Sequence, residues 1–157
     1  MPKIFHPLRR LRPVRTLLGL LLRRPIVGTS VIPLLPDGRI VLIRRRDNGR
    51  WGLPGGIVDW DEDIATAAKR ELAEETGLML TTVGRLVGVY SGAHRDPRFH
   101  SVCVALEAQA EGTFQIVDQA EVSEVRAFEV SDLPLAELAH DHQQQLQDYF
   151  TGKTVLA

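Results

Sequence analysis

Three glutamates, Glu71, Glu74 and Glu75, lie almost next to one another near the middle of the chain. On an α-helix each residue advances about 100°, so all three fall within about 80° of Ile64, on the side that also holds Ala68. Carboxylates gathered on the inner side of a helix repel one another, and their oxygens match hard cations such as Mg²⁺ or Mn²⁺. The pattern predicts a divalent-cation site; the alternative is a solvated acidic face neutralised by neighbouring basic residues.

The helix that carries these glutamates is predicted to span residues 61–76. Its start contains Asp61, Glu62 and Asp63, which suit an N-cap and the positive end of the helix dipole. It is followed by Gly77, the residue type that best tolerates the left-handed C-cap conformation. The glutamates therefore occupy the second half of a helix with well-marked ends.

The rest of the chain alternates between strand-like and turn-like segments. Apolar, β-branched runs flank a Pro-Asp-Gly turn and predict a hairpin of residues 27–35 and 39–45. We also expect turns at 47–49 and 131–134, a Gly/Pro-rich loop at 51–56, strands at 82–91, 100–107 and 122–130, and one or two C-terminal helices ending near Phe150. Strands on both sides of a central helix predict an α/β sandwich with a mixed sheet.

Residues 56–78 form a longer motif around the glutamates. Gly56 is followed after five residues by Glu62, and after seven more by Arg-Glu-Leu-Ala-Glu-Glu-Thr-Gly-Leu, which begins at Arg70. This pattern resembles the Nudix box at every defining position, and such a long match is far more specific than a lone glycine motif. Residues 51–56 resemble the family's usual entry into the box, and 132–134 its usual late turn. The resemblance covers about residues 26–150.

The resemblance implies a Nudix-type α/β/α sandwich with a mixed β-sheet, in which the box forms a loop–helix–loop. It implies Mg²⁺ or Mn²⁺ ligands at Glu74 and Glu75, and a further ligand or the base that orients water at Glu71. Gly55 or Gly56 is implied as the backbone carbonyl ligand, since close approach leaves no room for a side chain.

Other roles follow from the same resemblance. Arg70 and Glu62 are implied as a supporting ion pair for the carboxylates. Many family members use a further glutamate outside the box as ligand or general base, and here the candidates are Glu121, which spacing to the later turn favours, and Glu124. The chain departs from the family in having Asp61 where glycine is usual, which bears on the geometry of the turn.

Substrate contacts are predicted at two places. The stretch that contains Tyr90, Arg95 and Arg98 resembles the region after the box in ADP-ribose and nucleotide-sugar pyrophosphatases. The arginines suit phosphates, and Tyr90 or Phe99 suits stacking on a base. An equal alternative is a polar loop with Tyr90 packed in the protein core. At the end of a predicted strand, Arg44 and Arg46 share a face and are candidates for phosphate contact or for a solvated strand end. His140 and His142 are predicted to lie at the surface.

Composition bounds these expectations. The 157 residues suit one domain, and the net charge of −1 indicates no polyanionic partner. The one cysteine, Cys103, lies in an apolar run that reads as core, and this fits a cytoplasmic protein. Residues 1–25 form a basic extension to the Nudix domain at 26–157. Residues 1–24 are expected to pack on the domain or a second subunit; a membrane surface or nucleic acid is the less favoured alternative.

The sequence thus predicts a Mg²⁺- or Mn²⁺-dependent hydrolase that cleaves a phosphoanhydride bond in a nucleoside diphosphate derivative, ADP-ribose or a nucleotide sugar. The alternatives are a nucleoside triphosphate or RNA 5′-end pyrophosphohydrolase, and a non-catalytic nucleotide-binding module. A homodimer is compatible with the resemblance, but the sequence does not require it.

Overall fold

The computed structural model describes residues 24–96 and 99–157. Strands β1 (Ile26–Leu34) and β2 (Ile40–Arg45) form the predicted antiparallel hairpin. The Gly/Pro-rich segment is not simply a loop, because it contains the short strands β3 (Trp51–Gly52) and β4 (Gly55–Ile57), which pair with β2 and β1. Ladder hydrogen bonds join backbone groups, so a glycine-rich segment with poor strand propensity still pairs when the neighbouring backbone is close.

The next two strands along the chain are longer than the sequence suggests, and the third is shorter. β5 (Met79–Tyr90) and β6 (Ser101–Glu111) form an antiparallel pair, followed by β7 (Val122–Phe128) and a short β8 (Val155–Leu156). Residues 108–111 are rich in alanine and polar residues, which are poor strand formers. They extend β6 because Ala108 and Ala110 are buried in the apolar core.

The sheet is mixed, as predicted. Its strand order is β3-β2-β1-β6-β5-β8, with β4 added to β1 and β7 to β2. The pairs β1–β6 and β5–β8 are parallel and the others are antiparallel. The first half of β1 pairs with β4, and β2 meets β1 only at its far end. The paths of β2 and β4 therefore diverge along β1.

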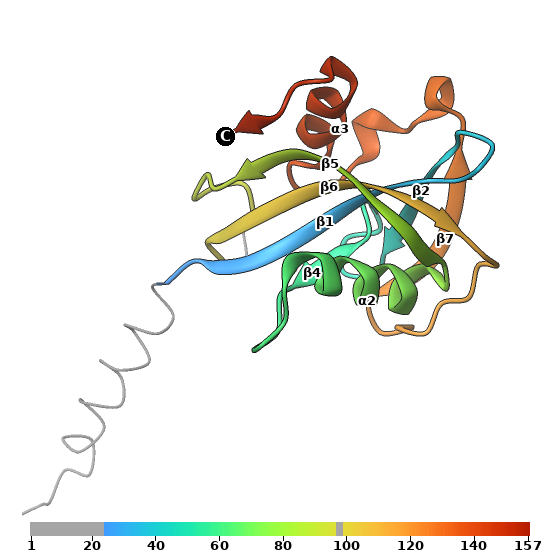
Figure 1. The fold of residues 1–157 in the computed structure, drawn as a ribbon, viewed down its shortest axis with the longest axis horizontal. Helices are drawn as coiled ribbons and strands as arrows, with labels where there is room; N and C mark the ends of the chain where they lie inside the picture. The colour runs from blue at the N-terminus through green and yellow to red at the C-terminus, as the bar shows by residue number, and fades with distance from the viewer. Residues whose placement is uncertain (1–23, 97–98) are drawn as a thin grey trace, which may run out of the picture.

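Helices cover both faces of the sheet. α2 (Ile64–Thr76) lies on one side of strands β1, β5 and β6, and α3 (His142–Thr151) lies on the other (Figure 1). Of the one or two C-terminal helices expected to end near Phe150, the structure has α3, which ends at Thr151. Two short 3₁₀ helices, Val130–Asp132 and Leu135–Glu137, lead into it from β7. The architecture is the predicted α/β/α sandwich, with β4, the following loop and α2 as the loop–helix–loop.

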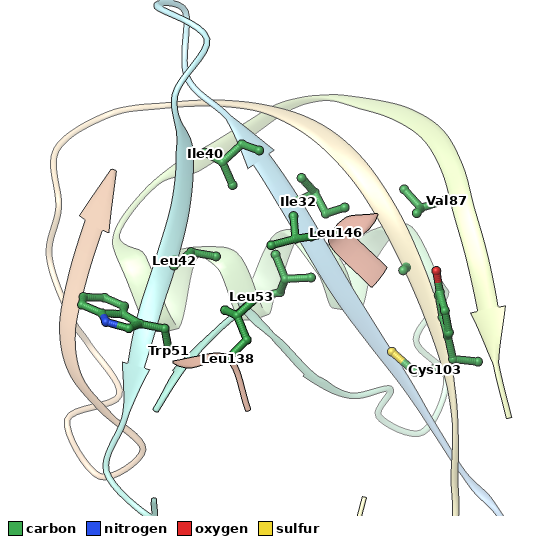
Figure 2. Close-up of a cluster of buried hydrophobic side chains, with 11 residues drawn as sticks. Ile32, Ile40, Leu42, Trp51, Leu53, Val87, Cys103, Leu138 and Leu146 are labelled. Atoms are coloured by element: carbon green, nitrogen blue, oxygen red, sulfur yellow. The ribbon is translucent and has the colours of Figure 1, made fainter. Parts of the chain in front are cut away.

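Two apolar clusters hold the layers together. Successive residues of β1 point to opposite faces, so that Val31 packs with Leu72 of α2 while Ile32 packs with Leu146 of α3. Figure 2 shows the second of these clusters, in which Leu53 and Cys103 also take part. Both faces of the central strand are therefore buried, and the predicted core position of Cys103 is confirmed.

Some of the predictions concern a possible contact with a membrane or residues whose structure is not described. Within the described ranges, no helix is long and apolar enough to cross a membrane. The predicted roles of the basic residues 1–23 fall outside the described residues, as does the predicted phosphate contact of Arg98.

Candidate active site

Local sequence fixes both ends of the glutamate helix. The backbone N–H of Thr66 donates to the N-cap carboxylate of Asp63 at 2.7 Å, so the helix begins at Ile64 and not at Asp61. Gly77 ends it in the left-handed conformation with φ of 77°. Asp61 also adopts a left-handed φ of 62° in the turn before the helix. Aspartate is one of the side chains that tolerate this region, and so it takes the place of the family's usual glycine.

Glu75 is the most deeply buried of the three glutamates, with 2% of its surface exposed. Its Oε2 accepts a hydrogen bond of 2.8 Å from the backbone N–H of Gly55. Burial, together with the charges of Glu71 and Glu121, raises the pKa of this carboxyl to about 8, although the hydrogen bond from the Gly55 N–H opposes the shift. Burial also raises the pKa of the Glu71 carboxyl. The inner face of α2 thus holds carboxylates short of positive charge.

Arg70 is the main counter-charge to this cluster. Its Nε and Nη2 donate to the two carboxylate oxygens of Glu62, each at 2.9 Å, which is the expected ion pair. Nη1 donates to Glu71 at 2.8 Å and reaches Glu74 at 3.5 Å. The hydrogen bonds from Arg70 lower the pKa of Glu62 to about 2. Arg70 therefore ties the loop before the helix to the carboxylates on it.

The two glycines before the helix have no space for a side chain. A Cβ on Gly55, whose φ is 151°, would lie 2.2 Å from the carbonyl oxygen of Thr29. A Cβ on Gly56 would lie 2.3 Å from Oε1 of Glu71. The backbone at Gly56 consequently lies against a carboxylate of the cluster, as close approach to a ligand site requires.

A cavity of about 390 Å³ opens beside these groups, a size that suits a small-molecule site. Its acidic side chains include Glu71, Glu74 and Glu121, and the guanidinium groups of Arg45 and Arg95 also line it. Strand β1, the β4 segment, α2 and the segment before β6 all contribute to its walls. In the two described ranges, no three acidic, histidine or cysteine side chains form a ready-made metal site.

The two candidates for the further glutamate outside the box differ in their position relative to the cavity. Glu121 lies at the cavity, and its charge acts on both Glu71 and Glu75. Glu124 instead forms ion pairs with Arg44, at 3.7 Å, and with Arg126. Position alone therefore associates Glu121, and not Glu124, with the glutamate helix.

The predicted substrate arginines divide in the same way. Arg95 lines the cavity, as does Phe99. Arg44 instead lies over the ring of Trp51 at 5.7 Å, and Arg46 donates to the backbone of Gln119 at 2.6 Å. The structure thus favours the solvated strand end for both, because alternation along β2 turns the intervening residue toward the cavity.

That intervening residue is Arg45, which was not among the residues predicted from the sequence. It lines the cavity and is paired with Asp47 through two hydrogen bonds of 3.0 and 2.9 Å. Tyr90 is 2% exposed, belongs to the core and donates its hydroxyl to Asp148 at 3.0 Å, which is the core alternative. The sequence gives no phase for Arg45, because residues 40–43 are all apolar and all buried.

The surface prediction for His142 is wrong. His142 is 9% exposed, lines the cavity, and accepts a hydrogen bond of 2.9 Å from the backbone N–H of Leu53. Burial, followed by the charges of His140 and Arg45, lowers its pKa to about 3. His140 also lines the cavity. The missed signal was the spacing of His142, Gln145 and Leu146, which places all three on the inner stripe of α3.

Comparisons with known proteins show the family to which the chain belongs. The model of the NUDIX domain family matches residues 24–149, and the chain belongs to that family. It is a Nudix hydrolase. An ADP-ribose pyrophosphatase of Methanocaldococcus jannaschii is 37% identical over 120 residues, which cover 74% of this chain and 69% of that protein.

Two further similar proteins come from other organisms. An RNA pyrophosphohydrolase of Caulobacter vibrioides is 46% identical over 69 residues, covering 41% of this chain and 39% of that protein. The crystal structure of a MutT NUDIX hydrolase from Burkholderia pseudomallei superimposes with a TM-score of 0.70 at 32% identity, covering 80% of this chain and 98% of that one. The sequence comparisons and the structural comparison therefore agree on the Nudix fold and on the hydrolase family.

Proposed function

We propose that the protein is a Mg²⁺- or Mn²⁺-dependent hydrolase of a nucleoside diphosphate derivative, namely ADP-ribose or a nucleotide sugar. The observation that carries this proposal is a single cavity that joins the carboxylates of Glu71, Glu74 and Glu121 to the guanidinium groups of Arg45 and Arg95. Such a cavity suits a ligand with anionic oxygens bound through cations on one side and arginines on the other. Similarity to the ADP-ribose pyrophosphatase over most of the chain supports this substrate class.

The residues fit a hard divalent ion. The raised pKa values of Glu71 and Glu75 mean that their anionic forms lack sufficient counter-charge, and the available donors are oxygens. Glu71, Glu74, Glu75 and the carbonyl of Gly55 would hold the ion. Since Arg70 lies 2.8 Å from Glu71 and 3.5 Å from Glu74, these carboxylates would exchange part of that contact for the ion.

The proposed reaction is the hydrolysis of a phosphoanhydride. The oxygen of water bonds to one phosphorus, the bridging P–O bond breaks, and its electron pair stays with the departing phosphate. A divalent ion, when bound, neutralises the anhydride oxygens and lowers the pKa of water. Glu71 or Glu121 would accept the proton from the attacking water, and Arg45 and Arg95 would orient the phosphates. The ion pairs of Glu124 with Arg44 and Arg126 make Glu124 the weaker candidate for the base.

The second candidate function is pyrophosphohydrolase activity on a nucleoside triphosphate or an RNA 5′ end. The partial similarity to the RNA pyrophosphohydrolase of C. vibrioides supports it. A non-catalytic binding module is the third candidate, although every glutamate of the box is present. A cytoplasmic location, a homodimer, the domain division at residue 25 and contacts made by residues 1–24 stay predictions.

A turnover screen with identification of products by mass tests the proposal. The panel contains ADP-ribose, nucleotide sugars, dinucleoside polyphosphates, nucleoside triphosphates and a 5′-triphosphate RNA, each with Mg²⁺, with Mn²⁺ and with chelator. We expect ADP-ribose or a nucleotide sugar to be cleaved at the anhydride only when the metal is present. Preferred cleavage of the RNA or of triphosphates would move the assignment to the second candidate, and the absence of turnover from folded protein would move it to the binding module.

A further inference from the structure

The wall of the cavity formed by α3 and the segment before β6 contains a chain of buried polar side chains. We propose that Asp141 is a positioning residue, which holds Arg95 in the cavity as a binding group for a substrate phosphate. The proposal rests on the proposed function for the identity of the ligand, but the geometry that holds Arg95 does not depend on it.

Arg95 is held by three hydrogen bonds. Its Nη1 donates to Oδ1 of Asp141 at 2.8 Å, its Nη2 donates to the hydroxyl of Ser101 at 2.7 Å, and its Nε donates to the Ser101 carbonyl at 3.4 Å. Only 13% of the Arg95 side chain is exposed, and it lines the cavity. A guanidinium has five N–H groups, so two remain for a ligand after these contacts with the described residues.

Asp141 is itself held from behind. The side-chain amide of Gln145 donates to Oδ1 of Asp141 at 3.1 Å, and the amide oxygen of Gln145 accepts a hydrogen bond of 2.5 Å from Ser30 on β1. Gln145 is fully buried and Ser30 is 2% exposed. The chain of contacts from β1 through α3 therefore determines where the Asp141 carboxylate, and with it the Arg95 guanidinium, can lie.

Asp141 occupies the N-cap position of α3, but its side chain does not cap the helix. An N-cap aspartate normally accepts a hydrogen bond from a backbone N–H in the first turn. Within the described part of the chain, Asp141 makes no such bond, and its carboxylate accepts from Arg95 and Gln145 instead. The Asp141 carboxylate thus binds Arg95 instead of making the N-cap hydrogen bond that would stabilise α3.

Stability alone does not account for this arrangement. Burying a charged pair with its polar neighbours costs desolvation, and apolar residues of similar volume are often as stabilising or more so. A guanidinium fixed at a cavity wall, however, binds an anion without first losing side-chain freedom. Glu71, Glu74 and Glu121 line the same cavity, and a cation held by these carboxylates would neutralise one phosphate. Arg95 is therefore suited to a phosphate that this cation does not neutralise.

The test compares Asp141→Ser and Asp141→Asn with the wild type. Serine preserves the capping capacity of the position but removes the partner of Arg95, whereas asparagine keeps an acceptor without the charge. For the best substrate of the panel, we expect Asp141→Ser to raise KM on the order of tenfold with kcat within about threefold, and Asp141→Asn to lie between. AMP binding, measured by calorimetry, should weaken in the same order.

Asp148→Asn is the matched control. Asp148 lies about two helical turns after Asp141, and it accepts from Tyr90 and Gln144 instead of from Arg95. We expect it to alter the melting temperature while leaving KM and AMP affinity unchanged. An unchanged KM and unchanged AMP binding in Asp141→Ser, or equal effects in Asp148→Asn, would overturn the role of Asp141, as would wild-type protein that does not bind AMP. If AMP binding depends on Asp141 but no substrate of the panel is cleaved, the proposed function fails and the positioning role stands.

Discussion

Glu75→Gln is expected to change how the stability of the metal-free protein depends on pH. A carboxyl whose pKa is raised in the folded state, here to about 8 from 4.5, binds more protons when folded than when unfolded. Its contribution to the free energy of unfolding is fully present below the unfolded pKa and is lost as the pH rises through the folded pKa. Glutamine copies the neutral acid and can still accept the hydrogen bond of 2.8 Å from Gly55.

The titration of His142 limits the pH range in which the loss of stability from Glu75 can be measured. Its pKa is lowered to about 3 from 6.5, so its contribution is present above pH 6.5 and is lost as the pH falls toward 3. Below pH 6.5 the two residues act in opposite directions, and stability should be nearly level. Between pH 6.5 and 8 Glu75 dominates, and the two shifts together give a loss of about 1 to 1.5 kcal/mol. For a chain of this size that corresponds to a melting temperature lower by roughly 3–5 °C.

The assay is thermal and urea unfolding of chelator-treated wild type and Glu75→Gln, at intervals from pH 5 to 8.5. Wild type should lose stability above pH 6.5, whereas the variant should lose much less. The loss that remains in the variant comes from Glu71, whose raised pKa acts in the same direction. Mg²⁺ or Mn²⁺ should stabilise the wild type more at pH 8 than at pH 6.5, because the ion binds the ionised carboxyl. Equal pH slopes in the two proteins would refute the account of Glu75 as a buried, uncompensated acid.

Three further changes test the supports of the site. Gly55→Ala should lower stability by about 2–4 kcal/mol, because its Cβ would collide with a backbone oxygen, while Gly38→Ala, with nothing within 4 Å, should cost clearly less; equal melting temperatures would contradict the packing argument. Arg70→Lys loses the paired hydrogen bonds to Glu62, so kcat should fall about tenfold or more with the fold retained, and wild-type turnover would count against it. His142→Phe should cost about 1–3 kcal/mol in urea unfolding by leaving a buried N–H unpaired, and an unchanged midpoint would argue otherwise.

The sequence was sufficient for the parts of the fold that depend on periodicity and on the motif. The inner stripe of α2 was predictable because helical spacing gathers Glu71, Glu74 and Glu75 with the apolar residues, and the bond between Glu75 and Gly55 accords with that inward face. The Arg70–Glu62 pair was likewise expected from the resemblance. Strands β3 and β4 were missed because their pairing depends on neighbouring backbone and not on the propensity of their own residues.

The cavity was less predictable, because distant segments form it. Arg45 differs from Arg44 and Arg46 only in its phase along β2, and that phase became evident once buried and exposed residues were known. His142 lies at the cavity because α3 packs across the sheet near Leu53, a contact between residues far apart in the sequence. Tertiary contacts of this kind leave little trace in local composition.

The proposed function places the carboxylates of α2 at the hydrolytic centre. Its most direct test is kcat for the best substrate of the panel, measured with saturating Mg²⁺ or Mn²⁺ in the wild type, Glu75→Gln and Glu124→Gln. Glu124→Gln is the control, since Glu124 pairs with Arg44 and Arg126 and not with the residues of the cavity. We expect Glu75→Gln to lower kcat on the order of 10³-fold or more while it remains folded, and Glu124→Gln to stay within about threefold of wild type. Near-normal turnover by folded Glu75→Gln protein would contradict the claim.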